Sequence, residues 1–174
     1  ISRCSVTNGQ YIAFLNDLVT RGFAQAALAC CPRERSGGGA KPGRSVYGRD
    51  QRGHFVLVPD HDGDLWDSQW PVLMVSFAAM QAFAAWKSEQ TGMIHRLPYE
   101  LEWEKAARGS GDQREHVWGT DAFDPNWCQV ALSSGRDRSK PAPVGTEGIQ
   151  LPCGHHFCLE CLQGYVTSKI NDGQ

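Results

Sequence analysis

The sequence predicts a compact domain of short helices, short strands and long packed loops. Helical patterns with cap residues occur at residues 7–22, 76–92 and 96–109. Two short apolar runs, at residues 54–58 and 71–75, predict buried strands, and Pro71 is compatible with the first position of a strand. Residues 32–45 and 110–149 are rich in loop-forming residues, so irregular segments connect these elements.

The first helix is predicted from "VTNGQYIAFLNDLV". Thr7 and Gln10 have the spacing of a capping box, and Gly22 marks the end of the helix. Apolar residues follow at i, i+3, i+4 and i+7: Tyr11, Phe14, Leu15 and Leu18. One face of this helix is therefore expected to pack against the core.

The segment "PDHDGDLWD" between the two predicted strands carries four aspartates, Asp60, Asp62, Asp64 and Asp67. Their spacing begins like a calcium loop, but Leu65 and Pro71 stand where an EF-hand needs glycine and glutamate. We expect a polar turn, and incidental calcium binding is the alternative.

Two more helices are predicted further along the chain. Ser76 is placed as the N-cap and Gly92 as the end of one helix, which directs Phe83 and Trp86 toward the core. In "RLPYELEWEKAARG", glutamates come early and basic residues late, which suits the helix dipole. Paired carboxylates can act in acid and base catalysis. Here the favoured interpretation is electrostatic capping by Glu100, Glu102 and Glu104.

Composition limits the kind of protein. A length of 174 residues suits one domain, alone or with a small appendage. Hydrophobic residues make up 41% and the net charge is −2, so neither global disorder nor binding to nucleic acid or an anionic membrane is expected. No apolar run approaches the roughly 20 residues of a membrane span, and we expect a soluble protein. The first residue is Ile1, which suggests a fragment or a processed piece.

Five segments share the order and approximate spacing of one known family. They read "VTNGQYIAFLN", "WPVLMVSFAAMQAFAAW", "TGMIHRLPYELEWEKAARG", "VWG" and "FDPNWC". Through them, residues 5–146 resemble the formylglycine-generating sulfatase-modifying factor family. The resemblance implies an α+β, C-type lectin-like fold with little regular secondary structure. It also implies metal-dependent oxidation, with copper in the formylglycine-generating branch and iron in sulfoxide synthases.

The chain departs from this family at its end and at one helix cap. The later family segments, which carry calcium ligands and the catalytic cysteine region, have no counterpart after about residue 148. We therefore expect an incomplete domain over residues 1–148 and assign it no catalytic residue. Cys4, Cys30, Cys31 and Cys128 match neither copper ligand and are expected to be buried small side chains or surface thiols. Tyr99 stands where the family usually has Thr or Ser, a loss of about 0.5 to 2 kcal/mol of capping energy.

Residues 149–174 have a different character. Cys153, His155, Cys158 and Cys161 follow the spacing of the centre of a RING finger, and the segment resembles the first RING of the RING-between-RING ubiquitin ligases. Thiolate and imidazole are the ligands that tetrahedral zinc prefers. Three outcomes stay open: no intact site, one zinc held by all four residues, or zinc shared with ligands elsewhere. The C-x-x-C spacing favours a reducing, cytoplasmic compartment.

The sequence is compatible with three functions. The first is a truncated formylglycine-generating-enzyme-like domain, inactive by itself, in a family of metal-dependent oxidoreductases. The second is a non-catalytic, lectin-like binding or scaffold domain for a protein or peptide partner. The third is a zinc-binding RING-type fragment, which would contact a ubiquitin-conjugating enzyme only with its zinc sites intact. Copper, iron and calcium belong to the family, and no ligand for them is assigned in this chain.

Overall fold

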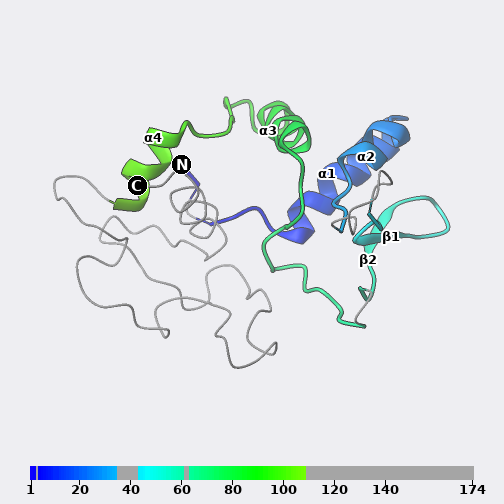
Figure 1. Ribbon diagram of the computed structural model, residues 1–174. Coiled ribbons are helices and arrows are strands. Elements are labelled where there is room, and N and C mark those ends of the chain that lie inside the picture. The colour runs from blue at the N-terminus through cyan, green and yellow to red at the C-terminus, as the bar shows by residue number, and fades with distance from the viewer. Residues whose placement is uncertain (3, 35–42, 61–62, 109–174) are drawn as a thin grey trace, which may run out of the picture. The chain divides into compact units, whose positions relative to one another are not determined.

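A computed structural model describes residues 1–2, 4–34, 43–60 and 63–108 of the chain. These residues fall into two compact units, one made of the described residues within 6–97 and the other of the described residues within 1–5 and 98–108. The first unit contains helices α1 (Asn8–Thr20), α2 (Ala24–Cys30) and α3 (Phe77–Thr91) and strands β1 (Tyr47–Arg49) and β2 (Phe55–Leu57). The second contains α4 (Glu100–Arg108) (Figure 1). Short helices and short strands thus confirm the predicted kind of domain in this part of the chain.

Helix α1 begins and ends as the sequence predicts. The Thr7 hydroxyl accepts a hydrogen bond from the Gln10 amide, and the Gln10 side chain accepts one from the Thr7 amide, both at 3.2 Å. At the other end Gly22 has φ +87°, and the amides of Gly22 and Phe23 donate to the carbonyls of Val19 and Leu18. This is the Schellman arrangement, which satisfies the last carbonyls of a helix.

Helix α2 is an element that the sequence analysis did not predict. Its alanine-rich sequence has high helix propensity but is only seven residues long, so no amphipathic pattern develops. The helix ends at Cys31, which is extended because Pro32 follows it. Helix α1 contacts α2, β2 and α3. Helices α1 and α2 lie close together in Figure 1. Short α2 is therefore stabilised mainly by packing.

The sheet differs from the prediction. Strand β2 lies within the predicted 54–58 run, but its antiparallel partner is β1, which the sequence analysis did not predict. The predicted strand at 71–75 is wrong. Pro71 forms a single bridge to Thr7, the Val72 amide donates to Val6, and Met74 has φ +56°. A positive φ in a residue with a side chain interrupts extended pairing, so this apolar run makes isolated contacts instead of a strand.

Helix α3 matches its prediction. The Ser76 hydroxyl accepts from the Ala79 amide at 3.2 Å, and Gly92 closes the helix with φ +68°. Phe83 and Trp86 contact the aromatic residues of α1, with ring centroids 5.4 to 5.6 Å apart in the cluster of Tyr11, Phe14, Phe83 and Trp86. The core of this unit is the packing of α1 and α3 with α2 and the sheet.

Helix α4 has half of a capping box. The carboxylate of Glu102 accepts from the Tyr99 amide at 2.8 Å, and the Tyr99 carbonyl accepts from the Trp103 amide. This supports electrostatic capping as the role of Glu102. All of residues 149–174, for which the sequence predicts a RING-like fragment, lie outside the described residues.

Replacing Tyr99 with serine should complete this capping box. A serine hydroxyl at that position can accept from the Glu102 amide, which should raise the free energy of unfolding by about 1 kcal/mol. The measurement is urea denaturation followed by circular dichroism. Tyr99→Ala is the matched control, because alanine removes the same 71% exposed ring without adding an acceptor. Equal stability of the two variants would contradict the prediction.

Candidate functional site

The four predicted zinc ligands, Cys153, His155, Cys158 and Cys161, lie outside the described residues. Within residues 1–108, where the structure describes them, no three His, Cys, Asp or Glu side chains come together as a metal site. In the same part of the chain, no helix is long and apolar enough to span a membrane.

The acidic segment forms a polar turn, as predicted. The two carboxylate oxygens of Asp60 accept from the Asp64 amide and from the indole Nε1 of Trp66, each at 2.9 Å. Asp60 and Asp64 also pair through their backbones, and Pro59 bridges to Leu65. The Asp60 carboxylate thus holds both the turn and the orientation of the Trp66 ring.

The next residues along the chain are attached to the start of α1. Carbonyls of Ser68 and Trp70 accept from the amides of Gly9 and Asn8, each at 2.8 Å. The Asn8 side chain, which is fully buried, donates to the Asp67 carbonyl at 3.0 Å and accepts from the Tyr47 hydroxyl at 2.7 Å. Residues 67–70 are therefore held in place by α1, and the Asn8 side chain that contacts them is itself held by Tyr47 of β1.

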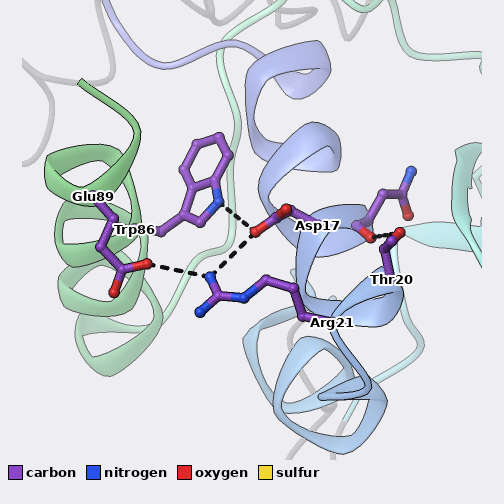
Figure 2. A network of polar contacts seen from close by, with 6 residues as sticks. Asp17, Thr20, Arg21, Trp86 and Glu89 are labelled. Atoms are coloured by element: carbon purple, nitrogen blue, oxygen red, sulfur yellow. Dashed lines mark hydrogen bonds and ion pairs between the residues drawn. The ribbon is translucent and has the colours of Figure 1, made fainter. Parts of the chain in front are cut away.

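A polar network joins α1 to α3 (Figure 2). The Asp17 carboxylate accepts from Trp86 Nε1 at 2.9 Å and lies 3.4 Å from Arg21 Nη1, which also reaches Glu89 at 3.2 Å. The side chains of Arg21 and Glu89 are 44% and 61% exposed. Exposed ion pairs contribute little, so we interpret the network as one that orients the two helices rather than as a catalytic group.

The described cysteines, Cys4, Cys30 and Cys31, are free thiols. Cys31 is buried against the Ser45 hydroxyl at 3.0 Å, and burial raises the pKa of its thiol. Burial also raises the pKa of Cys30. A thiol with a raised pKa is a poor nucleophile at neutral pH, which supports the expectation that Cys31 is a buried small side chain.

The burial of two tyrosine side chains, Tyr11 and Tyr47, predicts that the protein loses stability at alkaline pH. Tyr47 donates to Asn8, Tyr11 donates to the Cys30 carbonyl at 2.8 Å, and burial raises the pKa of both phenols above the ordinary value of 10. Unfolded phenols lose their protons above pH 10 while folded ones keep them. The contribution of the two protonated phenols to the free energy of unfolding is therefore fully present below pH 10. Above pH 10 the free energy of unfolding should fall by about 1.4 kcal/mol per pH unit for each phenol.

Urea denaturation between pH 8 and 11.5 measures this loss, and phenolate absorbance reports the ionisation. Tyr47→Phe should show a shallower decline, because one of the two buried ionisations is gone. A decline of the same steepness in Tyr47→Phe would contradict the assignment to Tyr47.

The site also contains residues that the sequence analysis missed. Trp66 and Trp70 have ring centroids 6.4 Å apart at an angle of 53°, and both are half-buried. The side-chain amides of Asn8 and Asn16 donate hydrogen bonds to backbone carbonyls that are far away in the sequence. The sequence signal for the tryptophans was their i, i+4 spacing within an acidic segment.

The described residues thus define a mixed helix-and-sheet domain in which the Asp60 carboxylate holds Asp64 and Trp66. The sequence model of the sulfatase-modifying factor enzyme 1-like domain, named FGE-sulfatase, matches residues 1–148, and the chain belongs to this family. The family implies the C-type lectin-like fold that the resemblance predicted. No solved structure matches the chain.

Among curated proteins, the chain is similar to hercynine oxygenases. It is 30% identical to that of Mycobacterium tuberculosis over 98% of this chain and 37% of the relative. It is 32% identical to that of Mycolicibacterium thermoresistibile over 91% of this chain and 32% of the relative. A formylglycine-generating enzyme of Thermomonospora curvata is 43% identical over 29% of this chain and 15% of its own length. The chain thus spans about a third of the length of the hercynine oxygenases it matches.

The Mycobacterium tuberculosis match extends beyond residue 148, where the family model ends. These comparisons therefore support an oxidative family for the chain, and the RING-like character of residues 149–174 stays a prediction.

Proposed function

We propose that this chain is the sulfatase-modifying-factor portion of an oxygenase of the hercynine-oxygenase kind. The carrying observation is the extent of similarity: two hercynine oxygenases match over 91% or more of the chain, whereas the formylglycine-generating enzyme matches over 29%. The substrate class is then a small betaine of histidine rather than a cysteine in a protein.

Among the residues described up to 108, no three His, Cys, Asp or Glu side chains come together, so we place the metal ligands of such a reaction outside the described residues. We attribute to the described part the roles of scaffold and of substrate surroundings. The prediction that the 174-residue chain is inactive by itself is part of this proposal.

A chimera tests the proposal directly. The matching segment of the Mycolicibacterium thermoresistibile enzyme is replaced by this chain, and the chimera is supplied with hercynine, a thiol, ferrous iron and dioxygen. Mass spectrometry should show oxygen-dependent consumption of hercynine by the chimera and none by the isolated chain. A parallel assay offers a sulfatase-type cysteine peptide with copper.

A folded chimera that leaves hercynine unchanged contradicts the proposal. Formylglycine formation in the parallel assay would place the chain in the other branch of the family. Circular dichroism of the chimera distinguishes loss of folding from loss of activity.

We also propose that Cys153, His155, Cys158 and Cys161 bind one zinc ion. Support comes from the ligand types and their close spacing in the sequence. Titration with cobalt should give a one-to-one tetrahedral spectrum that Cys158→Ser abolishes and that the matched control Cys4→Ser retains. Weak or non-stoichiometric uptake would contradict this site.

A further inference from the structure

Two tryptophan rings meet at an angle beside the acidic turn. The centroids of Trp66 and Trp70 lie 6.4 Å apart with 53° between the ring planes, and both side chains are half-buried. Trp66 packs against the hydrophobic core, and neither ring stacks on the aromatic cluster of α1 and α3 described above. Their mutual orientation resembles two neighbouring walls of an aromatic cage for a cation.

The Trp66 ring and the Trp70 backbone are held in place by groups that do not depend on a ligand. The Trp66 ring is oriented by its hydrogen bond to Asp60, at 2.9 Å. The backbone of Trp70 is attached to Asn8 and Asp67. Because the Trp66 ring and the Trp70 backbone are already ordered, a ligand bears less of the entropy of ordering this surface.

The charge around these rings favours a cation. Asp60, Asp64 and Asp67 lie within the same short segment, and Asp60 contacts the Trp66 indole directly. A carboxylate that accepts from indole Nε1 polarises the ring and makes its face more negative. Cation–π attraction, which is strongest for tryptophan, should increase accordingly.

Hydrogen bonding selects the kind of cation. Both Asp60 oxygens already accept hydrogen bonds, from Asp64 and Trp66, and an indole face is a poor acceptor for N–H groups compared with water. A primary ammonium or guanidinium would lose hydrogen bonds to water here. A quaternary ammonium has no N–H to satisfy and loses little on leaving water.

We infer that Trp66 and Trp70, beside the carboxylate of Asp60, form a binding surface for a quaternary ammonium group. The inference is drawn from this geometry and does not require the proposed oxygenase activity. It is compatible with that activity because hercynine carries a trimethylammonium group.

The test is ¹⁹F NMR of the whole chain labelled with 5-fluorotryptophan. The chain has six tryptophans, and single Trp→Phe variants assign the resonances. Tetramethylammonium and choline should shift the Trp66 and Trp70 resonances in a saturable manner. The neutral isostere 3,3-dimethylbutan-1-ol should bind about fivefold or more weakly, the size expected for cation–π attraction to two rings.

Three variants separate this site from general hydrophobic binding. Trp70→Leu and Asp60→Asn should each weaken choline binding about threefold or more, whereas Trp86→Phe, on α3, should leave it unchanged. Asp60→Asn keeps a side-chain acceptor, so it serves if a tryptophan variant fails to fold. Equal binding of choline and its isostere, no shift at Trp66 and Trp70, or unchanged binding in Asp60→Asn would overturn the inference. The catalytic assay is separate, so either proposal can fail alone.

Discussion

Replacement of Asn16 with leucine is expected to lower the free energy of unfolding by about 2 to 6 kcal/mol. The Asn16 side chain accepts from the Phe55 amide at 2.6 Å and donates to the Phe55 carbonyl at 3.1 Å. Phe55 is 1% exposed, so water cannot readily replace these bonds. Each buried group left without a partner costs about 1 to 3 kcal/mol, and the leucine leaves two.

The reason for this large effect is the position of Phe55 in the sheet. Strand β1 pairs with only one edge of β2, and the amide and carbonyl of Phe55 face the other edge, toward α1. Asn16 thus takes the place of a third strand at this residue. A helix side chain of this kind covers an edge that would otherwise be unsatisfied.

The measurement is urea denaturation together with hydrogen exchange at the Phe55 amide. Asn16→Asp is the matched control, since it keeps an acceptor for the amide but loses the donor for the carbonyl, and it should be intermediate in stability. Thr20→Ala removes an exposed hydrogen bond to the Asn16 carbonyl and should change stability by less than about 1 kcal/mol. If Asn16→Leu is as stable as Thr20→Ala, the role assigned to Asn16 is wrong.

Helix ends were the part of the fold that the sequence predicted best. Thr7, Gln10, Ser76 and Gly92 make the cap contacts expected of them, because capping depends on residues within one turn. The run at 71–75 was wrongly predicted as a strand, because its backbone makes isolated hydrogen bonds to Val6 and Arg33 instead of pairing with another strand. Local apolar patterns do not determine such long-range pairing.

The candidate site was predictable only in part. The hydrogen bonds of Asp60 lie within its own turn, so a polar turn could be inferred from the sequence. Asn8 contacts the Asp67 carbonyl 59 positions further along the chain, and no local pattern indicates this pair. Trp66 and Trp70 could be noticed as neighbours in sequence, but their relative angle depends on how residues 67–70 attach to α1.

The second large effect is expected for Gly48→Ala, which should destabilise the protein by about 3 kcal/mol. A Cβ atom at residue 48 would lie far inside van der Waals contact with Cγ1 of Val58. Gly48 pairs with Val56 in the sheet, so its backbone cannot move away without breaking the register of β1 and β2. Overpacking of this kind typically costs about 1 to 3 kcal/mol, and here the rigid partner places it at the upper end.

A double-mutant cycle with Val58→Ala tests the cause. The single change at Val58 should cost about 1 kcal/mol through lost packing, yet it should make the alanine at position 48 nearly harmless. The atom then nearest to the new Cβ is the Val58 Cβ at 3.4 Å, an ordinary contact. Urea denaturation of the four proteins should therefore give a coupling energy of about 3 kcal/mol that favours the double variant. Additive losses would show instead that Gly48 is required for some reason other than the approach of Val58.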